Sequence, residues 1–146
     1  VFAWSVAESA ADAGLPTDGP LFLASADLAA SRLHEAALGE LAEQNLPGAR
    51  VLGGEIFGIG NVIDDYYWQT VGVATELMAA YAEHDDFYSQ PFGTTPESLR
   101  HDPDTVAAKA RGREFVARAR DQYRGDRERM SLLTIYEGLF VDDGAS

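Results

Sequence analysis

The chain has 146 residues, a formal net charge of −13 and no cysteine. This length suits one domain with a single core, and a hydrophobic fraction of 46% excludes a disordered chain. Without cysteine there are no disulfides, thiol nucleophiles or thiolate metal sites. No apolar run reaches the roughly 18 to 20 residues that span a bilayer. We therefore expect residues 1–146 to form one domain with no membrane contact.

The charge is divided unevenly along the chain. Residues 1–99 hold 15 acids against only Arg32 and Arg50, whereas residues 100–146 hold nine acids and nine bases. An acidic body repels phosphate, which argues against nucleic-acid binding. We expect the basic segment 109–129 to lie against the acidic helices. The start, VFAWSVAESA, lacks the basic head of a secretory signal, so we expect a cytoplasmic location.

Proline and glycine divide the chain into helical segments. Helices are predicted near residues 2–13, 26–45, 56–87, 103–124 and 126–139, with Asp102 and Asp126 as caps of the last two. The glycine-rich stretch GGEIFGIG is interpreted as a turn that leads into a helix starting at Asn61, or else near Glu55. The only strand candidates, PLFLAS and ARVLGG, are short and do not alternate. The pattern predicts an all-α fold, a bundle of four to five helices.

Two adjacent acids head the aromatic run NVIDDYYWQTVGVATEL. Stepped at 100° per residue, Asp65 falls on a polar stripe with Gly72 and Glu76, whereas Asp64 borders the apolar face. A carboxylate in that position needs partners, because burying an unpaired charge is costly. Either Asn61 caps the helix with Asp64 at its third position, or Asp64 is a metal ligand.

The preceding helix carries a second pair of carboxylates. Glu40 lies about 20° from Leu33 on an otherwise apolar stripe, and Glu43 is on the same flank. If the two helices pack antiparallel, Glu40, Glu43 and Asp64 converge. Such oxygen ligands suit Mg²⁺ or Mn²⁺, and no Glu-x-x-His pair is present to suggest a di-iron site.

These acids resemble the metal ligands of the all-α NTP pyrophosphohydrolase (MazG-like) superfamily over roughly residues 32–78. Glu40-Leu41-Ala42-Glu43 is similar to the first acidic pair of that family, and Asn61-Val62-Ile63-Asp64 occupies the place of the second. Asn61 stands where the family has a glutamate, and Gly39 where another acid usually precedes the first pair. The resemblance implies Mg²⁺-dependent hydrolysis of a nucleoside triphosphate, with Glu40, Glu43 and Asp64 as the catalytic metal ligands.

A triphosphate substrate also needs cations, and segment 109–129 offers them. Arg113, Arg120 and Arg124 fall within about 40° on one helix face and are predicted to hold the triphosphate, since guanidinium groups bind phosphate bidentately. Arg111 and Arg118 form a separate cluster.

A second resemblance competes with the first. LFLASADLAASRLHEAAL and VGVATEL are similar to segments of nucleoside 2-deoxyribosyltransferases, which would make Glu76 the nucleophile of an α/β enzyme. The motif order agrees with that family, but the spacing between the motifs is too short.

A different class of function is a helical module without catalysis that binds a ligand or partner through an aromatic face. That face would comprise Tyr66, Tyr67, Trp68, Phe87 and Tyr88. Aromatic residues at helical spacing are more often part of a core. For the hydrolase we expect a homodimer.

Overall fold

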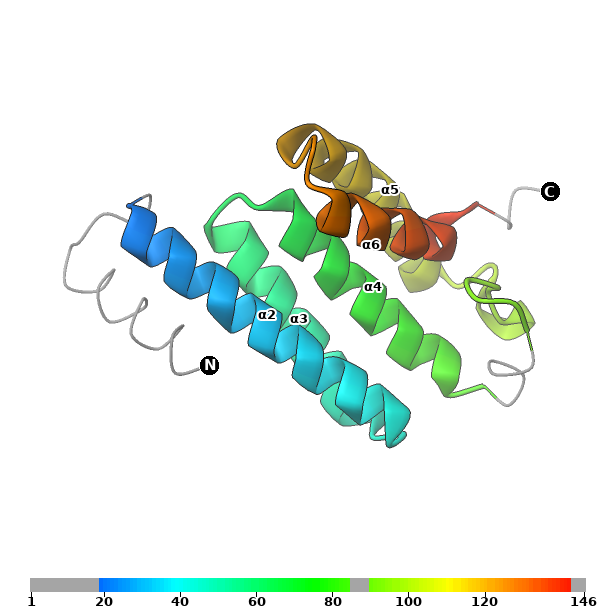
Figure 1. Cartoon of the computed structure of the whole chain (residues 1–146). Coiled ribbons are helices and arrows are strands. Elements are labelled where there is room, and N and C mark those ends of the chain that lie inside the picture. Colours follow the sequence, from blue (N-terminus) through cyan, green and yellow to red (C-terminus); the bar gives the residue numbers. More distant parts are fainter. Residues whose placement is uncertain (1–18, 85–89, 143–146) are drawn as a thin grey trace.

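The computed structural model describes residues 19–84 and 90–142 (Figure 1). Within these ranges the chain forms α-helices and short 3₁₀ helices, without a strand, which confirms the predicted all-α bundle. The α-helices are α2 (Pro20–Ala42), α3 (Leu46–Val62), α4 (Tyr66–Ala82), α5 (Pro103–Gln122) and α6 (Arg127–Glu137). The 3₁₀ helices are η2 (Glu97–Leu99) and η3 (Gly138–Phe140). The helix expected near residues 2–13 lies outside the described residues.

The helix predicted over residues 56–87 is wrong, because two helices occupy this part of the chain. The stretch GGEIFGIG is not a turn but lies inside α3, and Asn61 belongs to the last turn of that helix. The chain reverses at residues 63–65, where Asp64 adopts a left-handed backbone with φ 53°. Few residues other than glycine take this conformation, and aspartate is among those that tolerate it.

Side-chain caps fix where most helices begin. Asn45, Asp65, Asp102 and Asp126 each accept a hydrogen bond from the backbone N–H three residues later, at distances between 3.0 and 3.3 Å. Each cap satisfies one of the amide donors that a helix start leaves unpaired. The predicted caps Asp102 and Asp126 are therefore confirmed.

Helix α4 is the central element of the bundle and packs against α2, α3, α5 and α6 (Figure 1). Nearly all of its residues are buried, including Gln69, Thr70 and Thr75. The two threonine hydroxyls donate to backbone carbonyls one turn earlier, and the Gln69 side-chain amide donates to the carbonyl of Gly60. These internal bonds satisfy the polar groups that burial takes from water.

Glycines bring α3 and α4 unusually close together. A Cβ atom on Gly72 would lie 2.6 Å from the backbone nitrogen of Phe57, and one on Gly60 would lie 2.7 Å from that of Gln69. Any larger residue would push the two backbones apart. Gly53 and Gly60 of GGEIFGIG thus serve close helix packing rather than chain reversal.

Helices α5 and α6 cover the rest of α4, and α6 also reaches α2. The His34 ring nitrogen Nε2 lies 2.8 Å from the hydroxyl of Tyr136, which joins α2 to α6. Among the described residues no helix is both long and apolar enough to cross a membrane.

Candidate functional site

The carboxylates predicted to bind a metal do not converge. Glu40 lies near the end of α2, where the side-chain amide of Asn45 donates to it, and Glu43 is the exposed C-terminal cap of the same helix. Asp64 lies beyond the other end of α3, in the turn before α4. The residues that the structure describes include no group of three or more His, Cys, Asp or Glu side chains placed to hold a metal ion.

The connection between α2 and α3 explains this separation. It spans only residues 43–45, so the two helices form an antiparallel hairpin and the end of α2 meets the start of α3. Asp64 follows the 17 residues of α3, which extend about 25 Å at 1.5 Å per residue. The expected convergence of Glu40, Glu43 and Asp64 is therefore wrong, while metal-dependent hydrolysis itself stays a prediction.

Asp64 and Asp65 have exchanged the roles expected of them. Asp64 is exposed and contributes its backbone carbonyl to Gln122 through a 2.9 Å hydrogen bond. Asp65, expected to face solvent, is only 6% exposed and caps α4. It accepts from the backbone N–H of Trp68 at 3.0 Å and from the hydroxyl of Tyr123. The adjacent acids thus make a turn and a cap.

The arginines predicted to hold a triphosphate all have partners within the protein. Arg113 donates to the backbone carbonyl of Phe140, Arg120 pairs with Glu137 at 2.8 Å, and Arg124 pairs with Asp121 at 2.8 Å. The basic segment lies against α4, as expected. Its ion pairs are mostly within α5 and with α6, and Arg129 pairs with Asp27 of α2. Triphosphate binding by these arginines stays a prediction.

The aromatic face proposed for ligand binding is mostly core. Tyr67 and Trp68 are 7% and 3% exposed, Tyr66 is half-buried, and Phe87 and Tyr88 lie outside the described residues. Tyr67 and Trp68 pack against Arg129 of α6, a residue that no sequence pattern singled out.

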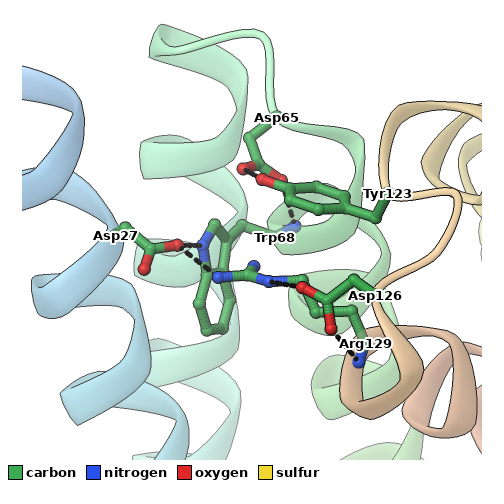
Figure 2. Close-up of polar contacts among 6 residues, drawn as sticks. All are labelled: Asp27, Asp65, Trp68, Tyr123, Asp126 and Arg129. Carbon is green, nitrogen blue, oxygen red and sulfur yellow. Dashed lines mark hydrogen bonds and ion pairs between the residues drawn. The ribbon is translucent and has the colours of Figure 1, made fainter. Parts of the chain in front are cut away.

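That arginine, Arg129, holds three parts of the bundle together (Figure 2). Its guanidinium carbon lies 4.5 Å from the ring centres of both Tyr67 and Tyr123. Its Nη2 donates to Asp27 of α2 at 2.9 Å, and its Nε lies 3.4 Å from Asp126. A cation over aromatic faces, fixed by carboxylates, is a strong local anchor.

The remaining contacts of this network tie it to α4. The indole Nε1 of Trp68 donates to Asp27 at 2.8 Å, and burial, with the adjacent Asp65 carboxylate, raises the pKa of Tyr123. Tyr123 therefore stays a neutral donor to Asp65. The Nη1 atom of Arg129 is buried without a hydrogen-bond acceptor among the residues described, and the surrounding aromatic rings offset that loss.

A cavity of about 410 Å³ borders this network and is lined in part by Leu23, Ile63 and Gln122. Its charged groups are Asp27, Asp65 and Arg129, and each of these already bonds to a neighbour within the protein. The network thus has a structural role, and this cavity offers a ligand no charged group that lacks a partner.

A second hollow, which we call the Glu76 cleft, has a different character. It has a volume of about 370 Å³ and lies where α3, the C-terminal half of α4, η2 and the start of α5 meet. Its charged side chains include Glu76, Arg50, Glu83 and Arg111, and apolar residues complete the lining. Arg50 and Glu83 form an ion pair at 3.1 Å, with both side chains 49% exposed.

Glycines of α3 create the place that the Glu76 side chain occupies. A Cβ atom on Gly53 would lie 2.9 Å from Cγ of Glu76, and one on Gly54 would lie 3.3 Å from its Oε1. Without these glycines the side chain would be displaced. The Gly53-Gly54 pair therefore lets a half-buried carboxyl group lie against the backbone of α3.

Glu76 and Arg111 face the same cleft without forming an ion pair with each other. Among the described residues Glu76 makes neither a hydrogen bond nor an ion pair. Arg111 has one contact, with its guanidinium carbon 6.0 Å from the ring centre of Phe57. Burial raises the pKa of the Glu76 carboxyl, and the charges of Arg111 and Arg50 oppose this shift. The cleft thus holds an acid and a base that are both open to a ligand.

Sequence reasoning named Glu76 only as the nucleophile of the transferase-like alternative, and periodicity placed it on a polar stripe with Gly72. That stripe instead faces α3, as the contact between Gly72 and Phe57 shows. A usable signal was present: paired glycines inside a helix, next to another helix with its own glycine, indicate close backbone packing.

Comparison of the chain with protein-family models, with curated proteins and with solved structures gives no match.

Proposed function

We propose that this protein is a helical module that binds a small polar ligand in the Glu76 cleft. The observation that carries the proposal is the state of Glu76, a half-buried carboxyl group without a partner among the described residues. Removing a carboxylate from water without a compensating hydrogen bond is costly. A ligand with an N–H or O–H donor supplies that bond, so binding relieves a cost that the empty protein carries.

The size and lining of the cleft suit a small molecule. A volume of about 370 Å³ falls in the usual range for ligand sites. Besides the charged groups, the lining includes the apolar residues Leu77, Ala80, Leu99 and Ala108. Apolar surface beside charged groups suits a small ligand that is itself polar.

The proposal is tested by following backbone amide signals in NMR spectra while small amines, amides and amino acids are added one at a time. We expect saturable shifts in α4 and α5 residues around the cleft, and we expect Glu76→Gln to weaken them. Arg118→Gln is the matched control, because Arg118 lies on α5 but pairs with Glu114 at 3.0 Å, away from the cleft lining. If no compound of the panel gives a saturable shift, the proposal fails.

The homodimer also stays a proposal. Leu21, Leu28 and Leu38 of α2 are 81%, 48% and 44% exposed, and exposed apolar side chains on one helix favour association. Sedimentation equilibrium over a range of protein concentrations should give twice the monomer mass of 15.8 kDa. A monomer mass at every concentration would exclude it. A cytoplasmic location stays a prediction as well.

A further inference from the structure

We infer that the ligand of the Glu76 cleft is a free α-amino acid with an apolar side chain, an inference that rests on the proposed function. The lining of the cleft includes the Glu76 carboxyl group and the Arg111 guanidinium, and neither has a hydrogen bond or ion pair among the described residues. A ligand that satisfies both must carry a positive group and a negative group. An ammonium and a carboxylate on one carbon meet that requirement.

Most of the other charged groups of the cleft are already engaged within the protein. Glu83 is paired with Arg50. Asp102 accepts from both the backbone nitrogen and the hydroxyl of Thr105 at 3.0 Å. Asp104 is exposed in the first turn of α5, where the helix dipole favours an acid. The lining of the cleft has more acidic than basic side chains. It therefore repels an anion without an ammonium group, whereas a zwitterion has no net charge to be repelled.

Arg111 is well suited to a carboxylate. It is exposed and extends from α5 beside Phe57 of α3, so an incoming anion displaces water but no internal partner. A guanidinium offers two parallel N–H donors that match the two oxygens of a carboxylate. The Glu76 carboxylate accepts hydrogen bonds from an ammonium in the complementary way.

The apolar part of the lining explains the preference for an apolar side chain. Leu77 is buried in this part, and Ala80, Leu99 and Ala108 are half-buried. Covering such a surface with aliphatic carbon removes apolar area from water, which favours binding. A branched aliphatic side chain of the size of leucine fills this space without adding a polar group that would need its own partner.

Three probes separate the contributions to binding. They are L-leucine, 3-methylbutylamine, which lacks the carboxylate, and 4-methylpentanoate, which lacks the ammonium. Titrations followed by NMR should show L-leucine binding about 10-fold or more tighter than either analogue, because each analogue loses one charge-assisted contact.

Two substitutions assign these contacts to residues. Arg111→Gln should lower the affinity for L-leucine to that of the amine while leaving the affinity for the amine unchanged. Glu76→Gln should lower the affinity for L-leucine and for the amine alike, and Arg118→Gln should change neither affinity. Far-UV circular dichroism confirms that each variant keeps its helices.

The possible results distinguish this inference from the proposed function. If the amine binds as tightly as L-leucine, or if another compound of the panel binds and L-leucine does not, the amino-acid inference is overturned and the cleft remains a ligand site. If neither these probes nor the panel gives a saturable shift, the proposed function fails and the inference falls with it.

Discussion

The Glu76 side chain is half-buried against α3. The cost of ionising a half-buried carboxyl group should appear in the pH dependence of stability. Burial raises its pKa above the ordinary value of 4.5, so the folded protein binds this proton more tightly than the unfolded chain. The wild type therefore loses stability as pH rises through the raised pKa. Glu76→Gln removes the charge and should be more stable than the wild type at pH 7.

This advantage should shrink as the pH falls through the raised pKa and vanish below about pH 4.5, where the carboxyl is protonated in both folded and unfolded states. Thermal melting from pH 4 to pH 7 measures it. A glutamine variant that melts at or below the wild-type temperature at pH 7 would show that Arg111 and Arg50 stabilise the ionised carboxylate more than burial disfavours it.

Arg129 is the residue on which the junction of α2, α4 and α6 depends. Arg129→Lys keeps the charge but cannot stack its head as a plane between Tyr67 and Tyr123 while bonding Asp27. We expect it to lower the free energy of unfolding by about 2 kcal/mol, measured by urea denaturation.

The matched control for this change is Arg124→Lys. Its ion pair with Asp121 has side chains 81% and 77% exposed, so the substitution should have almost no effect. Equal stability of the two variants would mean that the aromatic contacts of Arg129 contribute nothing.

At the residue scale, the sequence predicted that buried carboxylates need partners, but not which residues those partners are. Asp64 and Asp65 are adjacent, and helical periodicity places them 100° apart around the helix only if one helix runs through both. The left-handed turn at Asp64 breaks that periodicity, and the cap moves to Asp65. Arg129 was missed because its partners come from α2, α4 and the α5–α6 connection, which no local pattern brings together.

At the level of elements, the contact between α3 and α4 should depend on single glycines. Gly72→Ala places a methyl group 2.6 Å from the backbone of Phe57, so the helices must separate. We expect a loss of about 2 kcal/mol in unfolding free energy. Gly58→Ala is the control: its Cβ meets nothing within 4 Å, and replacing glycine inside a helix should increase stability by about 0.5–1 kcal/mol.

Chemical denaturation of both variants measures the free energy of unfolding, which should fall for Gly72→Ala and rise for Gly58→Ala. If Gly72→Ala leaves the free energy of unfolding unchanged, α3 and α4 can move apart freely. The close approach of α3 to the Glu76 side chain would then not depend on tight helix packing.

The same glycines explain which elements the sequence could predict. Helices α5 and α6 begin at the predicted caps Asp102 and Asp126, because an aspartate followed by proline or by a polar first turn is a local signal. The glycine-rich stretch of α3 was mistaken for a turn, because glycine has a low intrinsic helix propensity. Only close packing against α4 favours glycine at these helical positions. Local sequence carries the first kind of information and not the second.

For the whole molecule, the all-α architecture followed from periodicity, but the arrangement of its acidic residues did not. With 24 acids against 11 bases, the chain repels itself, and any added salt lowers that repulsion. A cation effect on stability is therefore evidence for a metal site only when it exceeds the effect of ionic strength. Glu40 and Asp64 lie beyond opposite ends of α3, so we do not expect a strong joint site between them.

We predict that MgCl₂ or MnCl₂ will raise the melting temperature no more than NaCl at equal ionic strength, with or without a nucleoside triphosphate. A specific ligand of the folded state stabilises by mass action, so a site that fills at millimolar Mg²⁺ would give a clear additional rise. Such a rise in the wild type, lost in Glu40→Gln and kept in Glu76→Gln, would favour the Mg²⁺-dependent nucleotide hydrolase over the amino-acid cleft. Equal curves in all three salts would leave Glu40 with the role its contact indicates, an acceptor for Asn45 at the α2–α3 turn.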